Sequence, residues 1–283
     1  MPGISFDRAA AYYDATRGYG EGSAERIRDA IVAYTGIGQG ARVLELGVGT
    51  GRIMLPFIRA GYDVTGVDLS QAMMDRLLAQ IAGDPGRAGY RVELHQADIT
   101  ALPFGDAAFD LVVAVHVLHL VDDWRAALRE ARRVLRPGGW LLIGHDSAPG
   151  DGRPIGGAAV PEPTLVRSQW LRLREELGVA QPAGRSNMWG SDRRLSDELA
   201  SLGARVEERT LAAFQRPPIT PREMFEHLRE RMYSSDWQTS DDVHGELIRR
   251  MGAWFDQHIA APDTPSATAG EFQVLSARWG DPG

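Results

Sequence analysis

The sequence contains no cysteine and no lysine. Without cysteine the chain has no disulfide, no thiolate metal ligand and no thiol nucleophile. Without lysine it has no Schiff-base amine and no P-loop, and all 31 of its basic residues are arginine. It also has no apolar run approaching 18 residues, so no membrane span is expected. The first residues lack the apolar core of a signal peptide, which predicts a cytoplasmic protein.

The remaining composition is that of an ordinary globular protein. The 283 residues are 43% hydrophobic and 24% charged, enough for one large domain with insertions or two small ones. The formal net charge of -7 argues against a nucleic-acid partner, because a nucleic-acid surface needs an excess of basic residues.

A glycine loop follows the first predicted strand. Residues 42–46 read as a short buried strand, and Gly47, Gly49 and Gly51 come directly after it. Glycine permits positive φ and lets a ligand touch bare main chain. A helix is expected to open at about Thr50 or Gly51, with its free N–H groups facing whatever lies over the loop. Asp68 ends a second apolar run, the place where a carboxylate usually holds a ribose diol.

The spacing of the glycines separates two kinds of cofactor. A dinucleotide fingerprint, G-x-G-x-x-G, needs its third glycine at position 52, which is Arg52 here. The chain has instead E-L-G-V-G-T-G, beginning at Glu45. Together with Asp68, this pattern resembles motif I and the following acidic motif of class I S-adenosylmethionine (SAM)-dependent methyltransferases.

Further segments resemble the UbiE/COQ5-like, or type 11, methyltransferases in order and spacing. They are A-D-I at 97–99 after a predicted third strand, F-G-D-A-A-F-D before an apolar fourth strand at 111–115, and L-R-P-G-G before a fifth strand at 140–143. The Tyr-Asp…Arg-Gly-Tyr run near the N-terminus resembles the cap that lies over the cofactor in that family. The resemblance covers roughly half of the chain well.

The resemblance implies a fold. This is an α/β, Rossmann-like mixed sheet of seven strands in the order 3-2-1-4-5-7-6, with strand 7 antiparallel, helices on both faces and a helical insert. It implies N-terminal cap helices (1–38), a SAM-binding domain (39–214 with 271–283) and substrate-cover insertions (148–190 and 215–270). The second insertion departs from the minimal family pattern. Its two amphipathic helices are a substrate cover, a homodimer surface or simple packing.

The resemblance also implies that SAM lies across the carboxyl ends of strands 1 to 4, with S-adenosylhomocysteine as the product. No metal is expected, because His116 and His119 lack a clear third ligand. The cofactor residues that the resemblance implies are Tyr19, Glu45, Gly47, Gly49, Gly51, Asp68, Leu69, Met73, Asp98, Ile99 and Val115.

Three residues are candidates for the catalytic base. His116 and His145 follow the fourth and fifth predicted strands at the edge where ligands bind in open α/β sheets, and histidine titrates near neutrality. Tyr13, from the cap, is the third candidate. Each of the three has an alternative role in structure or in positioning the substrate.

The sequence therefore predicts a SAM-dependent methyltransferase (EC 2.1.1.-) acting on a small aromatic, quinone-like or polyketide-like acceptor. A SAM-binding regulator without catalysis is an alternative, because the cofactor motifs survive the loss of a base. A protein methyltransferase is another, and an NAD-dependent oxidoreductase is disfavoured by Arg52. The acceptor atom and the oligomeric state stay open.

Overall fold

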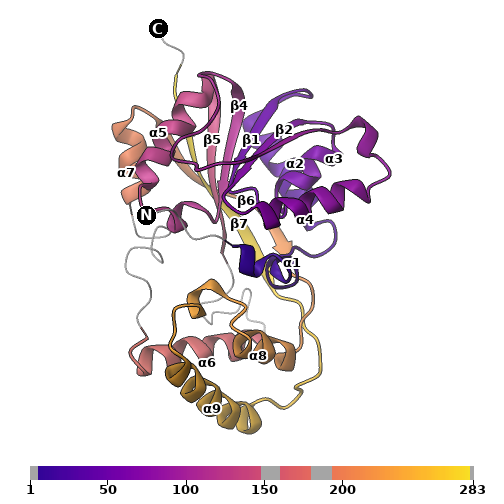
Figure 1. Cartoon of the computed structure of the whole chain (residues 1–283), viewed down its shortest axis with the longest axis vertical. Helices are drawn as coiled ribbons and strands as arrows, with labels where there is room; N and C mark the ends of the chain where they lie inside the picture. The colour runs from indigo at the N-terminus through magenta and orange to yellow at the C-terminus, as the bar shows by residue number, and fades with distance from the viewer. Residues whose placement is uncertain (1–5, 148–159, 180–192, 281–283) are drawn as a thin grey trace.

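The computed structural model describes residues 6–147, 160–179 and 193–280. A sheet covered by helices makes up one end of the molecule, and a smaller helical unit makes up the other (Figure 1). The strands are β1 (Arg42–Leu46), β2 (Asp63–Asp68), β3 (Arg91–Gln96), β4 (Phe109–Val115), β5 (Leu135–Ser147), β6 (Arg205–Gln215) and β7 (Ala269–Arg278). The helices are α1 (Tyr13–Arg17), α2 (Ser23–Thr35), α3 (Met54–Arg59), α4 (Gln71–Ala82), α5 (Trp124–Val134), α6 (Glu162–Glu176), α7 (Arg194–Ser201), α8 (Pro221–Arg229) and α9 (Asp241–His258).

The sheet has the predicted topology. Its seven strands run in the order β3-β2-β1-β4-β5-β7-β6. Strands β1 to β5 pair in parallel, and β7 pairs antiparallel with both β5 and β6. The Rossmann-like fold expected from the sequence is confirmed.

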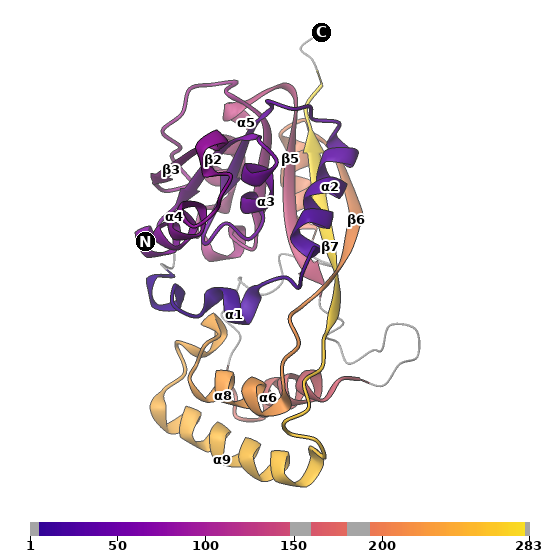
Figure 2. The same ribbon diagram turned by 90° about the vertical axis from the view of Figure 1, so that its right-hand side faces the viewer.

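Both faces of the sheet are covered, which explains the continuous apolar runs in its central strands. Val43 of β1 packs with α2, α3 and α4 on one face. Its neighbour Leu44 packs with α5 and α7 on the other face. Figure 2 shows α2 and α3 lying along one side of the strands. The carboxyl ends of the parallel strands therefore form an edge at which side chains converge.

Local capping signals in the sequence set several helix starts. The Ser70 hydroxyl accepts from the Met73 N–H at the start of α4, and Asp123 accepts from the Ala126 N–H at the start of α5. The expected start of α3 at Gly51 is wrong by three residues. Gly51 has a φ of +81°, which a right-handed helix cannot contain, so the helix begins at Met54.

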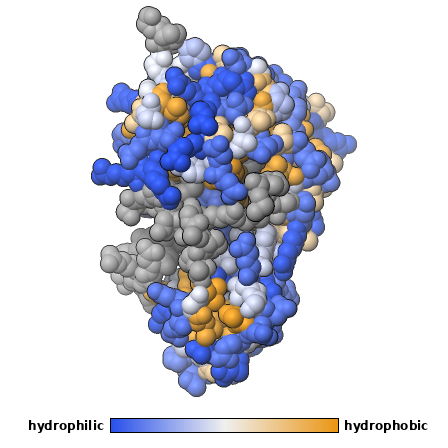
Figure 3. All heavy atoms as spheres, turned by 60° about the vertical axis from the view of Figure 1, so that its left-hand side comes forward, coloured by the Kyte–Doolittle hydropathy of each residue, from blue (hydrophilic) through white to orange (hydrophobic). Residues whose placement is uncertain are grey.

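The helical unit comprises α6, α8 and α9 around its own apolar cluster, with Trp170, Leu228 and Met251 buried inside it. It draws helices from both predicted insertions, parts of which (148–159 and 180–192) lie outside the described residues. The cap helix α1 lies between the sheet and this unit (Figures 1 and 2). Figure 3 shows a group of hydrophobic residues on one face of the helical unit. The roles of cover and dimer surface both stay predictions.

Within the described ranges, no helix is both long and apolar enough to cross a membrane.

Candidate functional site

The loop after β1 needs its glycines for two reasons. Gly47, Gly49 and Gly51 have φ values of +73°, +53° and +81°, in the left-handed region. A Cβ atom at Gly47 would lie 2.6 Å from Val117 Cγ2, and one at Gly51 would lie 2.4 Å from Leu77 Cδ1. The loop therefore presents main chain, with no side chain in the way, at the carboxyl end of β1.

Asp68 holds this loop from the neighbouring strand. Its Oδ2 accepts from the Gly49 N–H at 2.8 Å, and its Oδ1 accepts from the Ser70 N–H at 2.8 Å. Burial raises the pKa of Asp68, while these backbone hydrogen bonds oppose the rise. Each oxygen keeps a further lone pair, so the carboxylate can still accept hydroxyl groups of a ligand.

A cavity, here called the first cavity, lies over this loop and the carboxyl end of β4. The N-terminal segment contributes Phe6 and Tyr13 to its wall, and their rings pack edge to face at 6.1 Å. The predicted cofactor residues that line it are Gly47, Gly49, Asp68, Leu69, Met73, Asp98, Ile99 and Val115. The structure thus brings together most of the residues that the sequence singled out, with the cap above them.

Three predicted cofactor residues do not line the first cavity. Gly51 packs behind the loop against Leu77. Glu45 is buried in β1, where burial raises its pKa. Its Oε2 has no hydrogen-bond partner in the described part of the chain. Tyr19 lies farther along the cap, where it donates a hydrogen bond to Asp146.

His116 lines the first cavity and has an unusual backbone. Its φ of +52° is rare for a residue other than glycine and turns the chain sharply at the end of β4. Its Nε2 accepts from the Asp146 backbone N–H at 3.1 Å, so the neutral ring carries its proton on Nδ1. Burial lowers the pKa of His116, although the Asp146 carboxylate acts in the opposite direction. At neutral pH the ring is therefore an uncharged donor at the cavity wall.

The structure corrects the expectation for His145. Neighbouring residues of a strand point to opposite faces, and Asp146 is the one that turns toward His116. His145 pairs in register with Gln273 of β7 and interacts with it and with Glu208. The sequence analysis placed both histidines in one cleft. Only His116 lines the first cavity.

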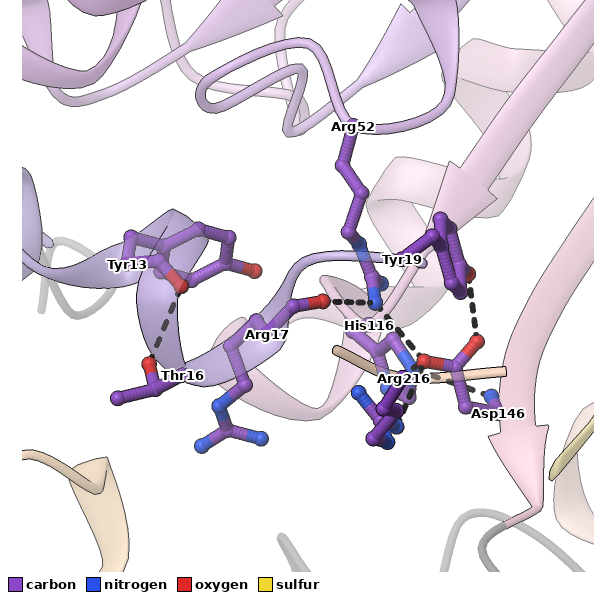
Figure 4. A network of polar contacts seen from close by, with 8 residues as sticks. All are labelled: Tyr13, Thr16, Arg17, Tyr19, Arg52, His116, Asp146 and Arg216. Carbon is purple, nitrogen blue, oxygen red and sulfur yellow. Dashed lines mark hydrogen bonds and ion pairs between the residues drawn. The ribbon is translucent and has the colours of Figure 1, made fainter. Parts of the chain in front are cut away.

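Asp146 is the centre of a buried polar cluster that the sequence analysis did not identify. Its carboxylate contacts Arg52 at 2.8 Å and Arg216 at 3.1 Å, and it accepts from the Tyr19 hydroxyl at 2.7 Å. Figure 4 shows these side chains converging on Asp146 from separate segments of the chain. The Asp146 side chain is only 4% exposed.

Charge complementarity stabilises this cluster. Burial would raise the pKa of Asp146, but Arg52, His116 and Arg216 hold it well below its usual range. Arg52 also stacks on the Tyr19 ring at 4.7 Å and donates to the Arg17 carbonyl oxygen at 3.1 Å. The cluster thus ties the cap to the glycine loop and to β5.

Comparison with known proteins agrees with this geometry. Residues 44–143 match the family model of a methyltransferase domain. The chain is 35% identical to a demethylmenaquinone methyltransferase of Renibacterium salmoninarum over 51% of this chain and 58% of that protein. It is 33% identical to a 27-O-demethylrifamycin SV methyltransferase of Amycolatopsis mediterranei over 58% of this chain and 56% of that one. The chain spans about half the length of these curated relatives.

Solved structures share the fold at lower identity. A phosphoethanolamine N-methyltransferase of Haemonchus contortus aligns with 97% of this chain and 58% of its own, at 19% identity and a TM-score of 0.54. The [4+2]-cyclase SpnF aligns with 99% of this chain and 100% of its own, at 20% identity and a TM-score of 0.54. The family match covers residues 44–143, and these solved structures show that the chain has the Rossmann-like fold of known methyltransferases.

Proposed function

We propose that the protein is a SAM-dependent methyltransferase that acts on a small molecule. The observation that carries the proposal is the first cavity, where the bare glycine loop, Asp68 and Asp98 line one wall. Support comes from the names of the relatives and from the Haemonchus contortus structure, which is a complex with S-adenosylhomocysteine.

The residues of the first cavity fit the parts of SAM. Asp68 has the lone pairs to accept the two ribose hydroxyls. Oδ1 of Asp98 accepts from Thr100, while its Oδ2 makes no hydrogen bond to a described residue and suits the adenine amino group. Met73 offers an apolar surface for the adenine ring. When bound, SAM supplies an electrophilic methyl group.

Two polar side chains of the first cavity remain for the acceptor, Tyr13 and His116. The lone pair of His116 Nε2 is occupied by the Asp146 N–H, so the neutral ring offers Nδ1–H as a donor. With this geometry, His116 is better suited to position the acceptor atom by donating a hydrogen bond than to remove its proton. Much of the rate enhancement can then come from alignment, which is worth up to about 7–11 kcal/mol in model systems. Tyr13 stays a candidate for the base.

We further propose an aromatic or quinone-like acceptor. Phe6, Leu120 and Val121 give the first cavity an apolar wall beside these polar groups. The relatives named for demethylmenaquinone and demethylrifamycin also support this class.

Binding of SAM without methyl transfer is the second candidate. One observation favours it: SpnF, named as a [4+2]-cyclase, shares the fold over nearly the whole chain. The fold therefore does not by itself establish the reaction.

Calorimetric titration with S-adenosylhomocysteine and with NADH tests the cofactor. We expect micromolar binding of S-adenosylhomocysteine, none of NADH, and loss of binding in Asp68→Ala. Asp75→Ala, an exposed aspartate in α4, is the matched control and should bind as the wild type does. Failure to bind S-adenosylhomocysteine, or binding of NADH in its place, would refute the proposal.

Turnover then separates the two candidates. Transfer of labelled methyl from SAM to a panel of phenols, quinols and amines is expected for at least one phenol or quinol. Binding of S-adenosylhomocysteine with no transfer to any member of the panel would favour the non-catalytic candidate.

A further inference from the structure

A second cavity lies between α1 and the helical unit. Thr16 and Arg17 of the cap form one wall. Arg167 of α6 and His227 of α8 form the opposite wall, and Arg216, just after β6, joins the two. Among the residues that the structure describes, none lines both this second cavity and the first.

The second cavity is strongly basic. Arg17, Arg167 and Arg216 line it, and none of the described residues in its lining is an aspartate or a glutamate. The chain as a whole has a formal net charge of -7, so this local excess of cations runs against the overall charge. A cavity of this charge favours an anionic ligand.

Two of these arginines have no carboxylate partner among the described residues. The guanidinium groups of Arg17 and Arg167 lie 5.1 Å and 4.1 Å from the centre of the Tyr233 ring. Burial lowers the pKa of Arg17. By contrast, Arg174, two turns farther along α6, forms a buried ion pair with Asp236. Helix α6 therefore carries Arg174, whose charge is neutralised by Asp236, and Arg167, whose charge is available to an anionic ligand.

Unused hydrogen-bonding groups point to the same conclusion. Nη1 of Arg167 and Nδ1 of His227 are both buried, and neither has a partner in the part of the chain that the structure describes. Buried polar atoms are nearly always hydrogen-bonded in native proteins. A ligand with several acceptor oxygens would satisfy both nitrogens, and it would also receive the charge of Arg17 and Arg167.

Asp146 and the cap connect the second cavity with the first. His116, which lines the first cavity, and Arg216, which lines the second, lie 3.5 Å and 3.1 Å from the Asp146 carboxylate. Tyr13 of the cap lines the first cavity, and Arg17, one turn later, lines the second. Figure 4 shows His116 and Arg216 in one network around Asp146, which reaches the Arg17 carbonyl oxygen through Arg52, with Tyr13 on the same cap helix. A molecule held in the second cavity thus lies next to the cluster that contacts His116.

We propose that the second cavity binds an oxyanion of the methyl acceptor, a carboxylate or a phosphate, through Arg167, Arg17 and His227. The identity of the ligand as the acceptor rests on the function proposed above. Ile219 and Met224, in the same lining, provide apolar contact for the carbon skeleton beside the anionic group. The aromatic or quinone-like acceptor proposed above then also carries an anionic group.

Three probes that share a phenyl ring test this inference on the full chain. Benzoate and phenyl phosphate carry the two oxyanions, and phenol is the neutral match. Each is titrated calorimetrically into the protein saturated with S-adenosylhomocysteine. We expect at least one anionic probe to bind about tenfold or more tightly than phenol, which corresponds to roughly 1.4 kcal/mol. The tighter of the two identifies the group as a carboxylate or a phosphate.

Two variants locate the binding. Arg167→Gln should bring the affinity for the anionic probe down to that for phenol. Arg172→Gln, an exposed arginine on the same helix and outside the cavity lining, should leave it unchanged. Equal affinities for all three probes, or anion binding that survives Arg167→Gln, would overturn the inference.

The design separates this inference from the proposed function. Binding of S-adenosylhomocysteine with no preference for the anionic probes refutes the oxyanion site alone. Failure to bind S-adenosylhomocysteine refutes the methyltransferase proposal and with it the assignment of the ligand as an acceptor. The Arg167→Gln variant should bind S-adenosylhomocysteine as the wild type does, which also shows that it is folded.

Discussion

Replacing Asp146 by asparagine should destabilise the protein strongly. The substitution keeps the size of the side chain and removes the charge that Arg52 and Arg216 share. Arg52 is only 10% exposed, so it would be left as a buried cation without its anion. Removing one partner of a buried ion pair costs about 3–5 kcal/mol, and we expect a loss of this size in the free energy of unfolding at pH 7.

The pH dependence of this loss follows from the depressed pKa of Asp146. A carboxyl group whose pKa is lower in the folded than in the unfolded state stabilises the fold above its unfolded pKa of about 3.9. That contribution is lost as the pH falls through the folded value, which is lower still. Because Asp146 also raises the pKa of His116, this difference should be constant above about pH 7, rise as His116 is protonated, and shrink below about pH 4, where Asp146 of the unfolded chain is protonated.

Urea unfolding followed by circular dichroism, at several pH values, measures this difference. Asp263→Asn is the matched control: Asp263, like Asp146, accepts two hydrogen bonds from arginine, here both from Arg222, but its side chain is 70% exposed. We expect little measurable change in the free energy of unfolding of Asp263→Asn. The double variant Arg52→Gln/Asp146→Asn should be more stable than Asp146→Asn, because it removes the uncompensated cation. A loss below about 1 kcal/mol at pH 7, the usual value of an exposed pair, would refute this reasoning, as would a difference that still grows below about pH 4.

Two further predictions concern the loop and the cavity wall. Gly51→Ala should lower the free energy of unfolding by about 1–2 kcal/mol for its left-handed backbone and by about 1–3 kcal/mol more for the contact with Leu77. Gly61→Ala, where φ is +84° and the space is open, should lower it only by the backbone amount. Urea unfolding measures both. Equal losses in the two variants would contradict the packing argument. In an NMR titration, the pKa of His116 should lie below the usual value of about 6.5 and fall further in Asp146→Asn, because burial lowers it and Asp146 raises it. A higher pKa in the variant would contradict the role given to Asp146.

Local pattern was sufficient for much of the fold. The glycine loop, the caps at Ser70 and Asp123, and the central strands all depend on residues close together in the chain. Most of the predicted cofactor residues lie directly after a strand, so the parallel sheet brings them to one edge. The strand order followed from the resemblance to the methyltransferase family and was confirmed.

The orientation of side chains beyond the motifs could not be predicted in the same way. His145 and Asp146 are neighbours, and which of them turns toward His116 depends on how β5 sits in the sheet. The sequence analysis proposed that His145 faces the same cleft as His116, whereas in the structure Asp146 turns toward His116. Arg52 entered the sequence analysis only as a missing glycine, although it is the closest ion-pair partner of Asp146.

By itself, then, the sequence determined the glycine loop, Asp68 and Asp98, because short-range motifs specify them, and its resemblance to the methyltransferase family determined the Rossmann-like sheet. Only the tertiary structure decided the Asp146 cluster and the basic second cavity. The cluster joins residues from positions 19, 52, 146 and 216, and the cavity joins the cap to helices from two insertions. Such contacts depend on how distant segments pack, and no repeat or spacing along the chain encodes them.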